Sequence, residues 1–173
     1  TANVITYNAA ISACEKGGKW QQALALLDQM REKGVTADVI TYNAAISACE
    51  KGGEVSESAS LLMRGMEEGL FVEAFSMEKG LDKLDLHGFP LDTAKALIRY
   101  FLDRKRRSIV AASPATKGTS DTRVVIVTGR GNHVNSDGRQ GVLREEVEVF
   151  LRQELEVEVT VPPDNPGRLV VTV

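Results

Sequence analysis

Apolar residues in the first part of the chain recur at the spacing of a helix. Four of them, at i, i+3, i+4 and i+7, form one stripe within residues 3–18: Tyr7, Ala10, Ile11 and Cys14. A second stripe follows within residues 20–30 and consists of Trp20, Ala23, Leu24, Leu27 and Met30. Glycines at positions 17, 18 and 34 interrupt the apolar pattern after each stripe. The pattern therefore predicts two amphipathic helices joined by a short turn.

The first of these segments occurs twice. Residues 3–18 read NVITYNAAISACEKGG and residues 38–53 read DVITYNAAISACEKGG, an offset of 35 residues with one difference, Asn3 against Asp38. A fixed period of this length is typical of stacked repeats in which each unit is a helical hairpin. Such hairpins bury their apolar faces against neighbouring units. We therefore expect a helical solenoid.

The period divides residues 1–73 into two units, 4–38 and 39–73. The second unit has weaker packing residues in its second helix, where Gly65 stands at the position of Met30. Weak packing is typical of a terminal unit, which has no following unit to cover it. Because two units are few for a stable solenoid, we expect further repeats before residue 1.

The pattern changes in the second half of the chain. Residues 74–80 have no clear period and are expected to be a linker, and residues 81–173 a separate domain. The elements predicted for this domain are, in order, a strand at 81–87, a helix at 90–104, a strand at 124–128, a helix at 142–154 and a hairpin formed by 157–161 and 168–173. The order β-α-β-α-β-β indicates a small α/β sandwich whose first two strands are parallel and joined by a right-handed crossover. The expected fold class is thus α + α/β, with helical-hairpin repeats before the sandwich.

Composition and charge narrow the class of protein. The 173 residues include 21 basic and 24 acidic side chains, a formal net charge of −3, and 43% hydrophobic residues, which is ordinary for a globular protein. No apolar run reaches the length of a membrane span, and two cysteines are too few for a disulfide framework. The mild acidity argues against a protein that coats nucleic acid by charge alone. Residues 99–139 nevertheless carry nine basic and three acidic side chains, include Arg104 to Arg107 and bracket the segment TGRG at 128–131. We expect this cationic segment to lie near TGRG, beside a phosphate backbone. The alternative is that Arg104 to Arg107 form a solvated helix end.

The unit VITYNAAISACEKGGKWQQALALLDQMREKGVTAD resembles a pentatricopeptide repeat (PPR). The resemblance implies an α-solenoid that binds single-stranded RNA at about one base per repeat. It further implies that the fifth and last residues of a repeat contact the base and that the second residue sandwiches it. These positions are Asn8 with Asp38 and Asn43 with Glu73 for the contacts, and Ile5 and Ile40 for the sandwich. In the family, a pair like Asn8 and Asp38 favours a pyrimidine base, usually U. In the second pair, Glu73 stands where the family commonly has Asp, so the resemblance implies no base for that repeat.

The residues themselves support a base contact at Asn8. Asn8 follows Tyr7 but lies off the apolar stripe, so its amide is expected to face solvent. An amide offers both a donor and an acceptor to the edge of a base. The alternative is that Asn8 only caps or decorates the start of a helix. Cys14 and Cys49 occupy equivalent positions on the buried stripe and are interpreted as core residues.

Two short motifs follow the first two strands of the second domain, where such folds gather binding and catalytic groups. In LDLHG, Asp85 and His87 are two residues apart on a strand and point to the same face, so the carboxylate can orient the imidazole, accept its proton or share a metal ion. In TGRG, Gly129 and Gly131 allow the backbone to approach a phosphate, and Arg130 supplies a cation. The alternatives are a structural histidine, an aspartate that caps the next turn, and a tight TGRG turn without a ligand.

Residues 81–173 resemble the small MutS-related (Smr) domain, whose signatures are LDLHG and TGxG. Members of that family bind nucleic acid, and several nick RNA or DNA. The resemblance implies a cleavage motif that contains Asp85 and His87. It implies a substrate-binding motif that consists of Thr128, Gly129, Arg130 and Gly131, and candidate assisting residues in the following loop, His133 and Arg139. The resemblance leaves open whether a divalent cation such as Mg²⁺ is required, and the sequence assigns no metal ligand.

PPR repeats followed by an Smr domain imply an RNA-processing protein of an organelle, chloroplast or mitochondrion. The leading hypothesis is a sequence-directed RNA endonuclease, in which the repeats find a single-stranded sequence and the Smr domain cuts near it. His87, held by Asp85, would act as a general base or metal partner, and Arg130 would stabilise charge on the phosphate. Two alternatives stay open: a non-catalytic RNA-binding factor or scaffold, and an Smr domain that acts on branched DNA. No membrane partner is expected, and the oligomeric state is open.

Overall fold

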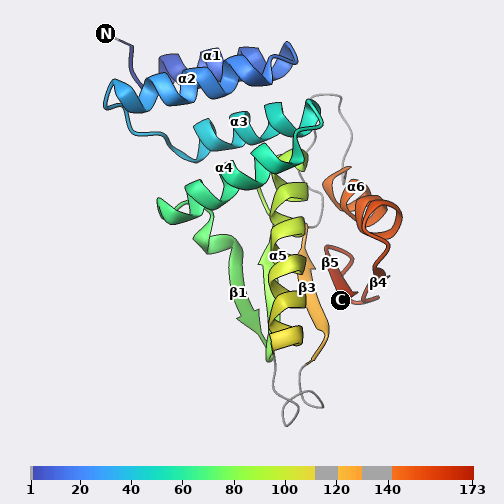
Figure 1. The fold of residues 1–173 in the computed structure, drawn as a ribbon. Coiled ribbons are helices and arrows are strands. Elements are labelled where there is room, and N and C mark those ends of the chain that lie inside the picture. The colour runs from blue at the N-terminus through green and yellow to red at the C-terminus, as the bar shows by residue number, and fades with distance from the viewer. Residues whose placement is uncertain (1, 112–120, 130–141) are drawn as a thin grey trace. The chain divides into compact units, whose positions relative to one another are not determined.

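Four helices of equal length form the first part of the chain (Figure 1): α1 (Val4–Lys16), α2 (Trp20–Glu32), α3 (Val39–Lys51) and α4 (Val55–Glu67). The computed structural model describes residues 2–111, 121–129 and 142–173, and the chain divides into two units, Thr1–Val72 and Glu73–Val173. In the first unit, α1 packs against α2 and α3, and α3 packs in turn against α4. The predicted pair of stacked helical hairpins is confirmed.

The starts of α1 and α3 show how the repeated sequence begins each helix. Asn3 and Asp38 each accept a hydrogen bond on a side-chain oxygen from the backbone N–H three residues later, at 3.1 and 2.9 Å. These caps satisfy N–H groups that a helix leaves without an internal partner. In α3 the cap is reciprocal, because the Thr41 hydroxyl also accepts from the Asp38 N–H at 3.1 Å. The one difference between the two copies therefore lies at a helix cap, where either residue can serve.

The same amino-acid sequence is buried differently in α1 and α3. Ala9 and Ala13 are exposed in α1, whereas their counterparts in α3, Ala44 and Ala48, are 6% and 0% exposed. The reason is that α3 contacts α1, α2 and α4. Burial in this unit thus depends on the neighbouring hairpin and not on the helix sequence alone, as in other stacked repeats.

The second hairpin is not weakly packed at Gly65, which corrects the expectation from the sequence. Gly65 is buried, and a Cβ atom at this position would lie 2.7 Å from Cε2 of Phe71. Phe71 is 5% exposed, and its ring packs edge-on against Tyr42 with the ring centroids 6.4 Å apart. The small residue makes room for an aromatic ring from the segment that follows α4. Met30, at the equivalent position of the first hairpin, is itself 0% exposed.

Within the described residues, a five-stranded sheet and two helices form the second unit. The strands lie in the order β1-β2-β3-β5-β4 and are β1 (Phe75–Glu78), β2 (Leu81–Asp85), β3 (Arg123–Val127), β4 (Glu158–Thr160) and β5 (Arg168–Thr172). As predicted, β2 and β3 are parallel, and the other neighbours are antiparallel. The helices are α5 (Leu91–Ala111) and α6 (Val142–Val149), and α6 continues into a π-helical turn, η2 (Phe150–Glu154). The predicted α/β class is confirmed, with one strand more than expected.

The additional strand is β1, which occupies residues predicted to be a linker. β1 pairs with β2 across a two-residue turn, Lys79-Gly80, in which φ is positive at both residues, 50° and 82°. Such turns match the twist of paired strands and favour glycine. Phe75 packs β1 onto α5, with its ring centroid 6.1 Å from that of Phe101. The linker prediction for 74–80 is wrong because a strand of four residues is too short to show a clear period.

Helix α5 is longer than the predicted helix of 90–104 and continues to Ala111. It begins beside the carboxyl ends of β2 and β3 and runs to the opposite end of the sheet (Figure 1). Arg104 lies 13 residues after Leu91, which is about 20 Å along a helix. Lys105 is accordingly paired with Asp82, near the start of β2, at 2.7 Å. The basic run was expected to lie beside the motifs. It lies instead at the far end of the sheet from LDLHG and from the end of β3.

Candidate nucleic-acid interface

The predicted base-contact residues Asn8 and Asp38 lie together in the first unit. Asn8 Nδ2 donates to the carboxylate of Asp38, at 3.2 Å from Oδ1 and 3.4 Å from Oδ2. On its other side, Asn8 Oδ1 accepts a hydrogen bond from the hydroxyl of Thr41 at 2.5 Å. Helix α1 carries Asn8, and the capped start of α3 carries both partners. The stacking of the two hairpins therefore builds this cluster.

The charge of Asp38 fixes the orientation of the Asn8 amide. Burial raises the pKa of Asp38, but hydrogen bonds from the backbone and hydroxyl of Thr41 and from the Asn8 amide lower it, and the resulting pKa lies below the ordinary value of 3.8. A charged carboxylate accepts hydrogen bonds and donates none, so Asn8 turns its NH₂ group toward Asp38 and its oxygen toward Thr41. One N–H and one oxygen lone pair of Asn8 are left over for a ligand.

Two exposed isoleucines stand on the first turns of the same helices. Ile5 in α1 is 72% exposed and Ile40 in α3 is 58% exposed. Ile5 precedes Asn8 by three residues, and Ile40 lies between Asp38 and Thr41 in the chain. Single exposed apolar residues are common on proteins, but these two recur at the same position of each repeat. Their place agrees with the predicted sandwich positions, and the base contact itself stays a prediction.

The second predicted pair is built differently from the first. Asn43 lies in α3 with a buried Oδ1 that has no hydrogen-bond partner among the described residues. Glu73, at the repeat position of Asp38, is exposed and lies in a short 3-10 turn, η1 (Val72–Ala74), at the start of the second unit. Strand β1 begins two residues after Glu73, whereas α3 begins directly after Asp38. Glu73 therefore caps no helix of the kind that positions Asp38.

In the second unit, LDLHG forms the end of β2 and the turn that leads to α5. Leu84 and Leu86 are both 0% exposed, Asp85 is half-buried and His87 is exposed, so the predicted alternation is confirmed. The Leu86 N–H donates to the carbonyl of Val127 at 2.7 Å and extends the pairing of β2 with β3. Asp85 Oδ1 accepts from the backbone N–H of His87 at 3.0 Å. This bond is the turn cap that was one of the alternatives, and it holds the main chain of His87.

Of the two residues after β3, Thr128 is bonded to Gly167, and Gly129 lies against His87. Thr128 is 5% exposed, and its backbone N–H and its hydroxyl both donate to the carbonyl of Gly167, at 3.0 and 3.3 Å. Gly129 has a φ of +78°, a conformation that residues with a Cβ rarely adopt. A Cβ atom on Gly129 would lie 3.0 Å from Cδ2 of His87, so the backbone there lies against the imidazole. The structure thus brings the two motifs together at one end of the sheet.

Four predicted site residues lie outside the described part of the chain: Arg130, Gly131, His133 and Arg139. Their roles stay predictions. Within residues 2–111, 121–129 and 142–173, no three His, Cys, Asp or Glu side chains gather in a way that would hold a metal ion. Asp85 and His87 are two ligands that a divalent cation could use at this strand end, and the described residues supply no third.

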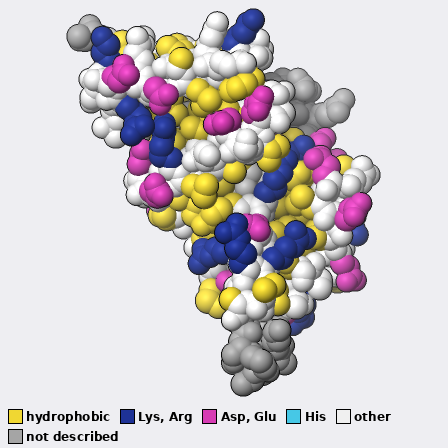
Figure 2. Space-filling model, viewed as in Figure 1, with side chains coloured by type: hydrophobic (Ala, Val, Ile, Leu, Met, Phe, Trp, Pro, Cys, Tyr) yellow, Lys and Arg dark blue, Asp and Glu magenta, His cyan; other side chains and the backbone are white. Residues whose placement is uncertain are grey.

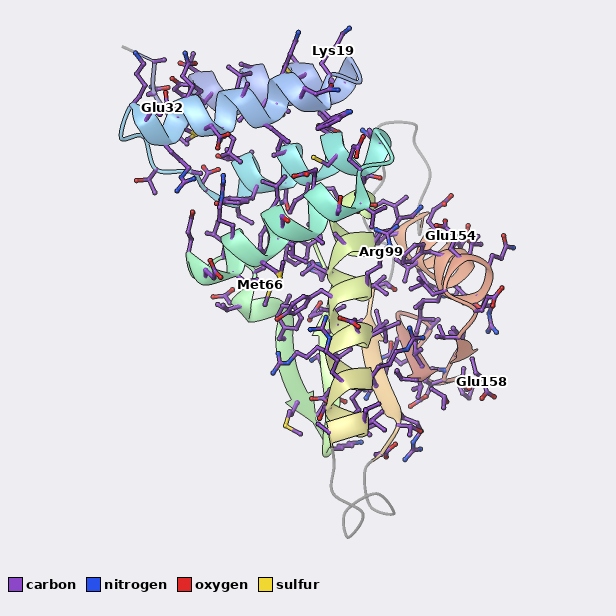
Figure 3. The ribbon with its side chains drawn as sticks, in the orientation of Figure 1. Lys19, Glu32, Met66, Arg99, Glu154 and Glu158 are labelled. Atoms are coloured by element: carbon purple, nitrogen blue, oxygen red, sulfur yellow. The ribbon has the colours of Figure 1, made fainter. Side chains whose placement is uncertain are left out.

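Two cations on α5, the helix that follows LDLHG, were not predicted from the sequence. Lys95 and Arg99 lie over the ring of Phe150, 5.2 and 4.9 Å from its centroid. Lys95 also pairs with Glu154 at 3.5 Å, and Figure 3 shows Arg99 on α5 and Glu154 on the facing turn η2. The available signal was the spacing of two basic residues at i and i+4 on the first half of the predicted helix.

Family comparisons agree with this division of the chain. Residues 84–171, just over half of the chain, match the model of the Smr domain. Residues 2–51 match the PPR repeat family, and residues 40–70 match the PPR repeat. No curated protein matches the chain. Among the helices in the described ranges, none combines the length and the apolar character that crossing a membrane requires.

Proposed function

The chain belongs to the Smr domain family and carries PPR repeats ahead of that domain, and on this premise we propose a function in RNA processing. The repeats bind single-stranded RNA, and the Smr domain cleaves a phosphodiester bond near the bound segment. The proposed setting is a chloroplast or mitochondrion, a choice that rests on the family resemblance.

The observation that carries RNA binding is the cluster of Asn8, Asp38 and Thr41. Its two partners hold the Asn8 amide in one orientation, which leaves a donor and an acceptor for the Watson–Crick edge of an unstacked base. The exposed Ile5 and Ile40 supply apolar surface for the faces of a base. The proposed ligand of this repeat is a pyrimidine, with uracil preferred.

Replacing Asn8 tests this binding site. Asn8→Ala removes both hydrogen-bonding groups and is expected to weaken binding of a labelled oligouridylate by about tenfold, or about 1.4 kcal/mol, as for a lost base contact. Asn43→Ala is the comparison variant, because Asn43 holds the same repeat position with its Oδ1 unpaired, and it is expected to cost less affinity than Asn8→Ala. Fluorescence anisotropy measures both affinities. Equal losses in the two variants would show that the Asp38 and Thr41 contacts do not make the site.

His87 is the proposed group for proton transfer during cleavage. It is exposed and lies against the backbone of Gly129, and an imidazole can take or give a proton at neutral pH. As a general base, His87 takes the proton of the attacking hydroxyl while that oxygen bonds to phosphorus and the bond from phosphorus to the leaving oxygen breaks. Asp85 is a positioning residue, which holds the turn through the main chain of His87. Arg130 is the proposed cation for the phosphate.

Substitutions at Asp85 separate positioning from direct chemistry. Asp85→Asn keeps an oxygen that can accept the His87 N–H, so it is expected to retain most of the cleavage of a uridine-rich RNA. His87→Ala is expected to lose a factor of about 10²–10⁴ in rate, as for a missing general base, and Asp85→Ala to lose activity because the turn is released. If Asp85→Asn fails as severely as His87→Ala, the carboxylate itself takes part in the reaction. Undiminished cleavage by His87→Ala rejects the catalytic assignment.

A non-catalytic RNA-binding factor is the second candidate function. The hydrogen bond from the backbone N–H of His87 to Asp85 favours this candidate, because it gives the carboxylate a structural role. On this view the wild-type chain yields no cleavage products over time, His87→Ala binds RNA like the wild type, and Asn8→Ala still binds more weakly. Gel electrophoresis of end-labelled RNA, run beside the binding measurements, decides between the two candidates.

A further inference from the structure

A groove lies between β1 and the second half of α5, at the end of the sheet remote from His87. Its volume is about 280 Å³. Its lining combines the apolar side chains of Phe75, Met77 and Phe101 with two serine hydroxyls and with three charged groups, Arg104, Lys105 and Asp82. The lining residues of α5 recur at i, i+3, i+4 and i+7, so they share one face of the helix. Neither sequence motif contributes to this groove.

The two cations of the groove differ in what they already bind. Lys105 is paired with Asp82 at 2.7 Å, and its side chain is 15% exposed. Arg104 is exposed and has no hydrogen bond or ion pair with any residue in the described part of the chain. Figure 2 shows Lys and Arg side chains next to hydrophobic side chains over this part of the unit. Arg104 therefore has a complete set of guanidinium donors at the rim of the groove.

The apolar part of the groove is accessible from β1, which is an edge strand of the sheet. Met77 is 69% exposed, although a large apolar side chain on an edge strand is a liability for solubility. Phe75 lies half-buried beside it and packs on Phe101 from α5. A nucleotide offers an apolar face on its base and a negative charge on its phosphate. An apolar wall beside an unpaired guanidinium matches both features.

We propose that this groove binds one nucleotide of single-stranded RNA, as a second contact site of the Smr domain. Arg104 binds a phosphate, and Met77 and Phe75 contact the face of a base. The volume lies just below the usual range for ligand pockets, which suits a single nucleotide and not a duplex. RNA that reaches from this groove to His87 follows α5 for about 20 Å. The choice of RNA over an acidic peptide rests on the proposed function and on the apolar wall.

Salt dependence of binding tests the phosphate contact. For single strands, log K falls with log salt by about 0.7 per phosphate bound, so Arg104→Ala is expected to make that slope shallower by about 0.7. The expected loss of affinity for oligouridylate is about two- to fivefold at moderate salt, as for an exposed charge pair. The matched control is Arg106→Ala, which makes the same charge change on the same helix about 200° around its axis. The control is expected to keep the wild-type slope.

An uncharged variant and a crosslink test the base contact. Met77→Ser removes apolar surface without changing the charge, so it is expected to weaken binding while the salt slope stays unchanged. Thiouridine-substituted RNA, irradiated on the wild-type chain, is expected to crosslink within residues 75–78, and mass spectrometry locates the site. Thermal unfolding of each variant checks that the fold is intact.

The failure of the groove can be told apart from the failure of RNA binding as a whole. If the wild type binds oligouridylate and Arg104→Ala keeps both its affinity and its slope, the groove is not an RNA site. If Arg104→Ala weakens binding of an oligoglutamate peptide and leaves RNA binding intact, the groove belongs to a protein partner. If the wild type does not bind RNA, both the proposed function and the groove site are rejected.

Discussion

The Thr41 hydroxyl links the cap of α3 to the Asn8 amide, and its removal should destabilise the first unit. Thr41 is 0% exposed, and its single hydroxyl proton is shared between Asn8 Oδ1 at 2.5 Å and Asp38 Oδ1 at 2.9 Å, while the hydroxyl oxygen accepts from the Asp38 N–H at 3.1 Å. Valine has nearly the same shape, so Thr41→Val removes all of these bonds and changes little else. Each net bond is worth about 1 kcal/mol, and an unpaired N–H near the core adds to the cost, so we expect a loss of about 2–3 kcal/mol.

The chain contains its own control at the equivalent residue of α1. The Thr6 hydroxyl bonds Asn3 Oδ1 at 3.1 Å in an exposed cap and has no contact with Asn8, so Thr6→Val is expected to cost at most about 1 kcal/mol. Urea unfolding of the whole chain, followed by the fluorescence of Trp20, the one tryptophan, measures both losses. A double-mutant cycle with Asn8→Ala is expected to give a coupling of about 1 kcal/mol for Thr41 and none for Thr6. Equal losses in the two threonine variants, or no coupling between Thr41 and Asn8, refute this reasoning.

Three further outcomes follow from individual contacts in the first unit. Gly52→Ala is expected to destabilise the unit by about 1–3 kcal/mol, because the new Cβ would lie 2.6 Å from Cδ1 of Trp20; an unchanged urea midpoint would contradict this contact. Cys14 is expected to react with a thiol reagent faster than Cys49, because Cys14 is half-buried whereas burial, assisted by nearby carboxylates, raises the pKa of Cys49 to about 11; peptide mass spectrometry measures the two rates, which should not be equal. Asp38 is expected to stabilise the unit at neutral pH and to lose this effect in acid, because the pKa of Asp38 in the folded state lies below the ordinary value of 3.8. The contribution of Asp38 to stability is therefore complete above pH 3.8 and disappears as the pH falls through the folded-state pKa. Urea unfolding in acid should show this loss in the wild type and not in Asp38→Asn.

The repeat period explains why the first cluster could be predicted in part. The period sets the bounds of each repeat, and the resemblance to the PPR family then implies the pair of Asn8 and Asp38. Thr41 could not be added, because only the geometry of the α3 cap shows that its hydroxyl turns toward the preceding hairpin. Similarly, the sequence at Gly65 shows a missing side chain but does not show which residue fills the space. Phe71 fills it, and a contact of this kind depends on the path of the chain after α4.

In the second unit, the position of the site could be predicted, but the role of Asp85 and the helical position of the basic run could not. Parallel strands end at the same edge of a sheet, so LDLHG and TGRG were expected to be neighbours, and His87 does lie against Gly129. An aspartate at a strand end can bond either an imidazole or a backbone N–H, and the shape of the turn decides between them. Residues 105–107 lay beyond the predicted helix, but α5 continues through them because Arg and Lys are good helix formers.

The identity of α1 and α3 also has a kinetic consequence. From the fourth residue of the chain to the end of α1, and from Val39 to the end of α3, the two helices share one sequence, so early in folding either of them can occupy the place of the other. Contacts made by residues that flank the two helices must then determine which position α1 takes and which α3 takes. The Asp38 carboxylate, which directly precedes α3, reaches Asn8 of α1 only when the two helices are in their own places. This contact therefore distinguishes the native arrangement from the exchanged one, and we expect its loss to let exchanged conformers persist as a slow refolding phase.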